Sequence, residues 1–152
     1  MTTIERTLVI AKPDAVQRGL VGEIFGRWER RGLQLIACKM IQVDRALAEE
    51  HYGEHKGKGF YEGLVSFITA SPVVVGVLSG PNAIEIVRTT NGATNPVKAA
   101  PGTIRADFGV DFGRNLVHAS DGAESAGREI ALWFKPEEIV PWSRTSEGWI
   151  VE

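Results

Sequence analysis

Histidine is the side chain best suited to proton or phosphoryl chemistry near neutral pH, and this chain has 3 histidines. His118 has the most constrained setting. It lies in the segment Asn-Leu-Val-His-Ala-Ser-Asp, near the end of an apolar stretch that predicts a strand and just before a predicted helix. Such a junction holds a side chain rigidly beside backbone N–H groups. A lone histidine on a strand is more often a hydrogen-bonded core group, so the interpretation of His118 depends on its neighbours.

The other two histidines, His51 and His55, have a spacing that can hold a metal ion on one side of a helix. Gly53 and Glu54 lie between them, and no third ligand is close in the sequence. We therefore interpret this pair as solvated surface residues. The sequence predicts no metal bound directly by side chains.

Groups that can bind phosphate occur in several segments that are distant in the sequence. They lie at the end of a predicted strand, at the end of a predicted helix, in or beside a long loop, and around a helical hairpin: Lys12, Arg88, Thr94, Arg105, Asn115, Tyr52 and Phe60. Taken alone, Lys12 is explained as a solvated strand end and Arg88 as a helix C-terminal cation. An ion pair with Asp107 explains Arg105, and core packing explains Phe60. Their function depends on whether the fold brings them together.

The common nucleotide-binding motifs are absent. Residues 53–59 contain glycines and a lysine but are one residue short of a phosphate-binding P-loop and lack its Ser or Thr, and no Gly-x-Gly-x-x-Gly follows a strand. The His-Arg-Asp signature of protein kinases is also absent, which excludes that class. Lys and Arg number 17 against 19 Asp and Glu, and the net charge of −2 excludes a protein that wraps nucleic acid by bulk positive charge.

The length of 152 residues is typical of one domain, and we expect residues 1–152 to fold as a unit. The single cysteine, Cys38, cannot form an intramolecular disulfide. The N-terminal residues lack the apolar segment of a signal peptide, and no apolar run reaches the roughly 18 residues that span a bilayer. These features predict a cytoplasmic protein that has no membrane partner.

The elements that position the candidate side chains follow from hydrophobic periodicity. Apolar and β-branched stretches predict strands at residues 7–11, 33–43, 72–79 and 116–119. A short helix capped by Asp14 follows the first strand, and the next helix buries Val21, Ile24, Phe25 and Trp28.

Four more helices are predicted, each from a cap or from apolar spacing. The first two form a hairpin. Asp44 caps a helix that runs to about Tyr52, and the second helix has Phe60, Leu64, Phe67 and Ile68 on one side. Asn82 with Glu85, and Asp121 with Glu124, resemble capping boxes for the last two. The final helix has as its inner face Ala126, Ile130, Trp133 and Phe134.

This order of elements predicts an α+β fold, namely a ferredoxin-like βαββαβ sandwich with an inserted helical hairpin. A long loop, residues 92–114, is rich in Gly, Pro, Thr and Asn, and loops of this length are usually functional or disordered. A C-terminal tail beyond Pro136 contains Trp142 and Trp149.

Three motifs, taken together, resemble those of the nucleoside diphosphate kinase family. They are K-P-D-A-V-Q-R-G-L-V-G-E-I at residues 12–24, G-A-T-N-P-x-x-A-x-P-G-T-I-R-x-D-F at 92–108 and G-R-N-L-V-H-A-S-D at 113–121. Three long motifs in the same order are specific, and the similarity runs from about Arg6 to the terminal W-I-V-E.

The resemblance implies a ping-pong reaction in which the γ-phosphate of a nucleoside triphosphate passes to a nucleoside diphosphate. The phosphoryl group is carried on His118 as a pros-phosphohistidine. A neutral imidazole has a free lone pair near pH 7, because its unperturbed pKa is about 6.5. Ser120 and Glu129 match positions that orient the imidazole or the phosphate, and Tyr52 matches a residue that supports the histidine. A solvent-facing helix position is the alternative for Glu129.

The same resemblance implies the nucleotide contacts. Lys12, Arg88 and Arg105 match phosphate-binding cations, Thr94 a phosphate donor, and Asn115 a sugar contact beside Lys12. Phe60, Leu64 and Phe112 match the residues that line the base site. Stacking on apolar surfaces tolerates every base, so we expect broad acceptance of purines and pyrimidines, and of ribose and deoxyribose.

Mg²⁺ is the cofactor that the resemblance implies, carried by the β- and γ-phosphates of the nucleotide instead of by protein ligands. The implied partners are nucleoside di- and triphosphates, such as ATP and GTP, and further copies of the chain. The terminal W-I-V-E resembles hexameric members of the family, which favours a hexamer over a tetramer. No obligatory nucleic acid partner is expected.

Four positions depart from the family pattern: Ala15, Ala106 and Ala119 stand where glycine is frequent, and Gly59 replaces a frequent proline. Alanine would be strained at any of these positions that required positive φ. Two other functions remain open at this point. They are a regulatory nucleotide-binding module without catalysis and a protein that binds single-stranded nucleic acid on Phe60 and Phe112.

Overall fold

The computed structural model describes residues 3–152, and residues 1 and 2 of the predicted domain lie outside the described range. The described chain forms a sheet with the strand order β2-β3-β1-β4 and antiparallel pairing throughout. The strands are β1 (Ile4–Ala11), β2 (Gln34–Ile41), β3 (Val73–Pro81) and β4 (Val117–Ala119). This arrangement confirms the predicted ferredoxin-like α+β fold. Its register places His118 opposite Ile10, near the end of β1 where Lys12 follows.

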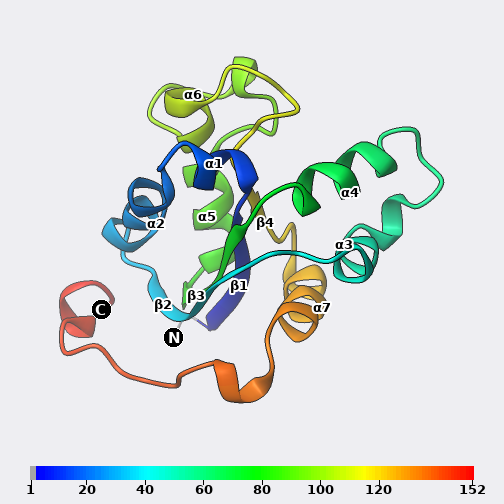
Figure 1. Cartoon of the computed structure of the whole chain (residues 1–152). Coiled ribbons are helices and arrows are strands. Elements are labelled where there is room, and N and C mark those ends of the chain that lie inside the picture. Colours follow the sequence, from blue (N-terminus) through cyan, green and yellow to red (C-terminus); the bar gives the residue numbers. More distant parts are fainter. Residues whose placement is uncertain (1–2) are drawn as a thin grey trace.

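Helices connect the strands in the predicted order (Figure 1). They are α1 (Pro13–Gln17), α2 (Val21–Arg30), α3 (Arg45–His51), α4 (Tyr61–Thr69), α5 (Ala83–Asn91), α6 (Ile104–Phe108) and α7 (Ala123–Trp133). Short 3₁₀ turns lie at η1 (Gly53–His55), η2 (Pro96–Lys98), η3 (Pro136–Glu138) and η4 (Glu147–Trp149). Figure 1 shows that α3 and α4 project together to one side of the sheet, as the predicted hairpin requires.

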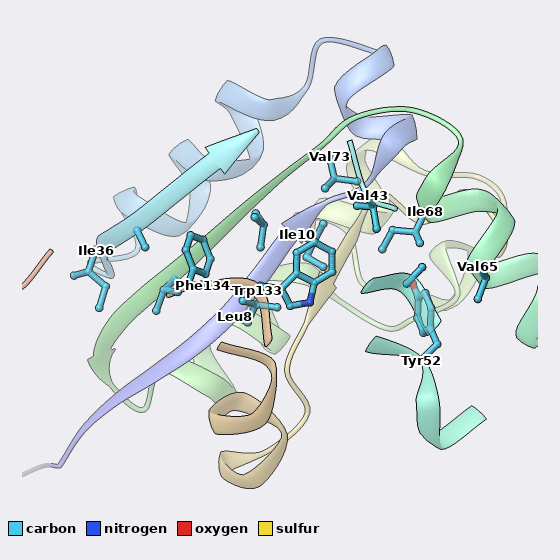
Figure 2. Close-up of a cluster of buried hydrophobic side chains, with 14 of the residues drawn as sticks. Leu8, Ile10, Ile36, Val43, Tyr52, Val65, Ile68, Val73, Trp133 and Phe134 are labelled. Carbon is cyan, nitrogen blue, oxygen red and sulfur yellow. The ribbon is translucent and has the colours of Figure 1, made fainter. Parts of the chain in front are cut away.

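Alternation along β1 divides the core into two layers, because successive side chains of a strand point to opposite faces. Leu8 and Ile10 belong to a buried cluster with residues of α3, α4 and α7. Figure 2 shows this cluster, with Trp133 packed close to Leu8 and Ile10. Val9 and Ala11 belong to a second cluster with residues of α1, α2 and α5. The strand that leads to Lys12 is therefore fixed from both sides.

The buried faces of the helices agree only partly with the sequence pattern. In α2, Ile24, Phe25 and Trp28 are buried as predicted. In α4 the predicted face is only partly correct. Ile68 is buried and Leu64 packs against the core as predicted, but Tyr61 and Val65 are buried as well and Phe60 is 53% exposed. The helix begins at Tyr61, so Phe60 stands at its N-cap and the apolar stripe is shifted by one residue.

Asp44 caps α3 as predicted, by accepting a hydrogen bond from the Leu47 N–H at 2.8 Å. The predicted capping box of α5 is wrong. Asn82 adopts a left-handed conformation at φ 56° and its side chain makes no cap, whereas Glu5 of β1 accepts from the Ile84 N–H at 3.2 Å. A free backbone N–H in the first turn of α5 is thus hydrogen-bonded by a residue distant in the sequence.

The predicted cap of α7 is also wrong, because the Gly122 N–H donates to Ser125 Oγ at 3.0 Å and Ser125 in turn donates to Asp121. Ser125 thus takes the role predicted for Glu124. Asp14 caps no helix. It lies inside α1, and its carboxylate accepts from the Leu116 N–H at 3.0 Å. A contact with the chain before β4 therefore replaces the predicted cap.

The long loop is ordered and contains its own helix, α6. Arg27 of α2 donates to Asp107 at 2.6 Å and to the Gly102 carbonyl at 3.2 Å. Arg18 donates to the Phe108 carbonyl at 2.7 Å. These bonds fasten α6 to α2 and to the turn before it. Because Asp107 pairs with Arg27, an ion pair with Asp107 does not explain Arg105.

The C-terminal tail follows the edge of β2 (Figure 1). The Val140 N–H donates to the Ile36 carbonyl at 2.8 Å, and Trp142 Nε1 donates to the Leu35 carbonyl at 3.1 Å. Arg144 donates to the Gly32 carbonyl at 2.9 Å. Across residues 3–152, no helix is both long enough and apolar enough to cross a membrane.

Candidate active site

A cavity of ≈ 220 Å³ opens where the ends of β1 and β4 meet the hairpin and the long loop. It collects most of the side chains that the sequence placed in separate segments: Lys12, Tyr52, Arg88, Thr94, Arg105, Asn115, His118 and Glu129. Ser120 lies beneath the cavity, fully buried. Phe60, Leu64 and Phe112 are outside its lining. The structure therefore brings together the predicted phosphate and histidine groups. Of the predicted base contacts, Phe60 and Phe112 are exposed on the surface, and Leu64 is partly buried against the core.

His118 is held through one ring nitrogen. Its Nε2 lies 2.9 Å from Glu129 Oε1, and Ser120 Oγ donates to the same oxygen at 2.7 Å. Glu129 is only 5% exposed, so a solvent-facing position is excluded. Burial alone would raise the pKa of Glu129, but hydrogen bonds and charge from His118, with the Ser120 bond, lower it below the usual range.

The ionised state of Glu129 determines the tautomer of His118. A carboxylate only accepts hydrogen bonds, so the imidazole proton is on Nε2. In the neutral ring, Nδ1 then carries the free lone pair. His118 lines the cavity, where a phosphoryl group can approach this nitrogen.

The prediction that His51 is a solvated surface residue is wrong. His51 is 3% exposed, and its Nδ1 accepts a hydrogen bond from Trp133 Nε1 at 3.0 Å. Its ring packs edge-to-face on His118, with 4.5 Å between ring centroids. Burial, followed by the neighbouring His118, lowers the pKa of His51 well below 6.5, so the ring is neutral at pH 7. His55, at the mouth of the cavity, is partly exposed.

Nitrogen and oxygen atoms of His51, His118 and Glu129 lie within 4.8 Å of one another, a spacing that suits a metal ion. Their hydrogen bonds oppose that use. Trp133 donates to Nδ1 of His51, which places the proton on Nε2 of that ring, and Glu129 accepts from Nε2 of His118. One free lone pair therefore remains on the two rings, at Nδ1 of His118, and the cluster acts as a rigid support for that ring.

Lys12 and Asn115 meet at the floor of the cavity. Lys12 Nζ donates to Asn115 Oδ1 at 2.8 Å, and Asn115 Nδ2 donates to the Thr94 carbonyl at 3.0 Å. Burial, followed by repulsion from Arg105, lowers the pKa of Lys12 to about 8, partly offset by Asp14. The ammonium is thus charged at pH 7 but is poorly solvated, so an anionic ligand would stabilise it.

Arg105 is buried and its guanidinium donates to three backbone carbonyls. They belong to Gly92 at 2.9 Å, Asn115 at 3.1 Å and Val117 at 2.6 Å. Burial, then repulsion from Arg88, lowers the pKa of Arg105 to about 10. The three bonds fix the plane of the guanidinium, and two of its five N–H donors remain for a ligand.

The rim of the cavity is more open. Arg88 and Thr94 are both exposed, and Arg88 forms no ion pair with any residue of the described chain. Tyr52 is buried beside His51, at 4.7 Å between ring centroids. Burial, with the nearby Glu129 charge, raises the pKa of Tyr52, so its phenol stays protonated. Thus Arg88 and Thr94 are exposed polar groups of the cavity lining, and Tyr52 packs against His51.

The four departures from the family pattern have no backbone cost. Among residues 3–152, positive φ outside glycine occurs only at Asn82 and Leu116. Ala15, Ala106 and Ala119 therefore adopt ordinary backbone conformations. The φ of Gly59 is not positive either, since the glycines with positive φ are at 19, 32, 57, 92 and 102.

An imidazole whose proton is fixed on Nε2, and which lines the same cavity as Lys12, Arg88 and Arg105, suits phosphoryl transfer through histidine. The fold and the site thus define a histidine-dependent phosphotransferase.

Comparisons with known proteins identify the family. A sequence model described as nucleoside diphosphate kinase matches residues 5–139, so the chain belongs to the nucleoside diphosphate kinase family. This confirms the predicted family and the predicted phosphotransferase activity. A nucleoside diphosphate kinase from Chloroflexus aggregans is 61% identical over 151 residues, covering 98% of this chain and 100% of that one. An Archaeoglobus fulgidus relative of the same name is 58% identical over 149 residues, covering 98% of this chain and 99% of that one.

Two solved structures are similar over nearly the whole chain. A halophilic nucleoside diphosphate kinase from Halobacterium salinarum, in complex with CDP, has a TM-score of 0.95 and 49% identity, covering 99% of this chain and 100% of that one. A transition-state mimic of the Borrelia burgdorferi enzyme, with vanadate and ADP, has a TM-score of 0.91 and 42% identity and covers 95% of each chain.

Proposed function

We propose that this chain passes the γ-phosphate of a nucleoside triphosphate to Nδ1 of His118 and then to a nucleoside diphosphate, in a ping-pong cycle. The observation that carries the proposal is the bond between His118 Nε2 and Glu129, which leaves Nδ1 as the free nucleophile in a cation-lined cavity. The vanadate and ADP of the Borrelia burgdorferi structure support a phosphoryl-transfer transition state in the family.

In the first half-reaction, the Nδ1 lone pair attacks the γ-phosphorus. The bond from that phosphorus to the β,γ-bridging oxygen breaks, and the electron pair leaves with the nucleoside diphosphate. Positive charge develops on the imidazole, and the buried Glu129 carboxylate stabilises it through the Nε2–H bond. Ser120 positions that carboxylate. In the second half-reaction, a β-phosphate oxygen of another diphosphate attacks the phosphohistidine, and neutral His118 returns.

The cations act on the phosphate oxygens, where negative charge is spread in the transition state. Arg105 presents a guanidinium whose plane is already fixed by three carbonyls, so its N–H groups need little reorganisation. Lys12 supplies a buried ammonium, and Arg88 and Thr94 approach from the rim.

The rest of the nucleotide binds with little selectivity. Lys12 and Asn115 contact the sugar hydroxyls, while Phe60, Leu64 and Phe112 form an apolar surface for the base. A π-face is common to every base, so purines and pyrimidines, and ribose and deoxyribose forms, all serve as substrates. Related structures with CDP and with ADP support the acceptance of a pyrimidine and a purine.

Mg²⁺ enters as part of the nucleotide complex. Two of the three carboxylates lining the cavity already have partners, because Glu129 is bonded to His118 and Ser120, and Asp121 accepts from Ser125; the third, Glu54, lies beside His55. This donor set fits an ion held by phosphate oxygens and water. When bound, the ion neutralises charge on the β- and γ-phosphates.

The assembly is proposed to be a homohexamer, in preference to a tetramer, and the enzyme is proposed to act in the cytoplasm. The hexamer rests on the resemblance of the terminal W-I-V-E to hexameric members. A mass from multi-angle light scattering tests it. Six times the chain mass of 16.6 kDa is expected, and four times that mass would contradict it.

The phosphoenzyme test decides the main proposal. Incubation with Mg²⁺ and γ-labelled ATP, without acceptor, is expected to label the protein at one acid-labile, base-stable site. His118→Asn should abolish both the label and nucleotide exchange. His55→Asn is the matched control, because His55 is at the cavity mouth but has no bond to Glu129, and it should keep the label. A label that persists in His118→Asn would refute the mechanism.

A further inference from the structure

Two residues before His118, the backbone adopts a strained conformation. Leu116 has φ 75°, a region where the Cβ of a bulky residue is crowded. The Val117 N–H donates to the Asn115 carbonyl at 2.9 Å, which closes a three-residue γ-turn around Leu116. The form of this turn with positive φ is rare and strained. Such a conformation persists only where the surrounding structure holds it.

The segment Lys12-Pro13-Asp14 holds both peptide groups of Leu116. Asp14 Oδ2 accepts from the Leu116 N–H at 3.0 Å, and the Leu116 carbonyl accepts from the Lys12 N–H at 2.9 Å. The second bond joins two backbone groups directly beyond the β1–β4 ladder, which ends at Ala11 and Val117. The first bond depends on the Asp14 side chain, so a substitution at position 14 removes it without altering the sheet.

The turn sets the direction of the groups that surround the reaction. Arg105 donates to the carbonyls on either side of Leu116, those of Asn115 and Val117. Asn115 also accepts from Lys12 through its side chain. A change of φ at Leu116 rotates the neighbouring peptide planes. Arg105 and Lys12 would then lose the partners that fix them.

The other oxygen of Asp14 offers a second observation. Asp14 Oδ1 is buried and has no hydrogen-bond partner among the described residues. A buried carboxylate oxygen without a partner is costly, so an ordinary solvated acid in the first turn of a helix does not explain this side chain. The bond that Oδ2 accepts from the Leu116 N–H gives a reason for a carboxylate at this position despite that cost.

We propose that Asp14 is a positioning residue for phosphoryl transfer, acting through the Leu116 N–H to hold the strained turn that places Asn115, Arg105 and His118. The inference rests on the proposed function of those three residues. Asp14 itself touches neither His118 nor the substrate.

Two substitutions at Asp14 separate its hydrogen bond from its charge. Asp14→Ala removes the acceptor and should lower kcat about 10- to 100-fold, the loss expected when reacting groups are misplaced by about 1 Å. Asp14→Asn keeps an oxygen that accepts from Leu116 and should restore most of kcat. Glu138→Ala is the matched control. Its carboxylate also accepts a backbone N–H, that of Lys135 at 2.8 Å, but it lies outside the cavity, and this variant should keep wild-type kcat.

The pH profile separates the two effects further. Asp14 is a negative charge beside Lys12, whose other charged neighbour is Arg105. Loss of that charge lowers the pKa of Lys12 in both variants and moves only the alkaline limb. Loss of the hydrogen bond lowers the constant value that kcat reaches at pH values below the alkaline limb, here called the plateau. A plateau equally low in Asp14→Asn and Asp14→Ala would overturn the proposal, and so would a wild-type plateau in Asp14→Ala.

A second pair of variants tests the strain without relying on activity or on the folding of Asp14→Ala. Leu116→Ala and Leu116→Gly remove nearly the same buried side chain, but only glycine adopts φ 75° without a Cβ clash. Leu116→Gly should therefore have the higher Tm, the reverse of the usual order in a strand or helix. A lower Tm for Leu116→Gly would show that the turn is not strained, which would overturn the proposal.

Hydrogen exchange distinguishes failure of this inference from failure of the proposed function. The Leu116 amide should be protected in the wild type and in Asp14→Asn, and should exchange faster in Asp14→Ala. Wild-type protection of this amide in Asp14→Ala would overturn the inference whatever the activity. Absence of a phosphohistidine label in the wild type would instead refute the proposed function.

Discussion

The two ends of the proposed nucleotide site differ in how firmly the chain holds them. At the phosphate end, Lys12 and Arg105 are 9% and 8% exposed, and side chains or carbonyls fix both. At the base end, Phe60 and Phe112 are 53% and 62% exposed. The ring of Phe60 lies 5.2 Å from that of His55 and 5.8 Å from the Lys58 ammonium.

This difference follows from the chemistry that each end performs. Charge that develops in a poorly solvated cavity is stabilised only by groups already in place, because moving them during the reaction costs energy. Stacking needs an apolar face and tolerates variation in the base. The comparison predicts that substitutions at the phosphate end act on kcat and that substitutions at the base end act on KM.

The largest effect is expected at Glu129. Glu129→Ala removes the carboxylate that fixes the His118 tautomer and stabilises the charged ring, so kcat should fall about 10²- to 10³-fold. Rapid-quench measurement of the first phosphoryl transfer checks this, since KM should change little. Glu129→Gln keeps an acceptor oxygen and should fall between the wild type and Glu129→Ala. A wild-type transfer rate in Glu129→Ala would remove the basis of the comparison.

A smaller effect is expected from titration of Lys12. Its pKa of about 8 means that the free enzyme loses this positive charge as the pH rises. The kcat/KM for a nucleotide should therefore fall about tenfold for each pH unit above about 8, because kcat/KM reports groups of the free enzyme. Lys12→Arg keeps its charge, so its profile should lack this limb even if its plateau is lower. An unchanged limb in Lys12→Arg would assign it to another group.

Stability should move in the opposite direction over the same pH range. The folded-state pKa of Lys12 lies below the ordinary lysine value of 10.5, so burial of the charged amine lowers stability below pH 8. That penalty disappears as the pH rises from about 8 to 10.5, and the contribution of Lys12 to the free energy of unfolding rises. Activity and the free energy of unfolding should be measured over the same pH range. If activity falls while the free energy of unfolding does not, the cause is titration of Lys12 in the site and not alkaline unfolding.

Local patterns were sufficient for most of the fold. Runs of β-branched residues identified all four strands, and the spacing of Ile24, Phe25 and Trp28 identified the buried face of α2. Errors occurred where a distant residue replaces a local one. Glu5 satisfies the start of α5, a contact that depends on the alignment of β1 with that helix and has no local signal.

The site was predicted less completely from residues alone. The roles of most site residues came from the resemblance. The structure brings the residues that are predicted to bind phosphate into one cavity. The prediction that His51 is solvated is wrong because its partner Trp133 is 82 residues away, so nothing near His51 in the sequence marks the ring as buried. The predicted helix cap at Asp14 is wrong for a similar reason, since its partner Leu116 is 102 residues away. Long-range polar contacts leave no periodic pattern in a sequence.

The smallest effect is expected at the base end. Phe60→Ala removes one stacking surface, and because that ring is half exposed the loss should be near the lower end for stacking, ~1 kcal/mol or about a fivefold rise in KM. The rise should be similar for ADP, GDP, CDP and UDP, and kcat should stay near the wild-type value. Phe112→Leu keeps an apolar surface and should change KM less. If Phe60→Ala lowered kcat and left KM unchanged, the ring would be positioning the phosphates, and the division between a rigid catalytic end and a permissive base end would fail.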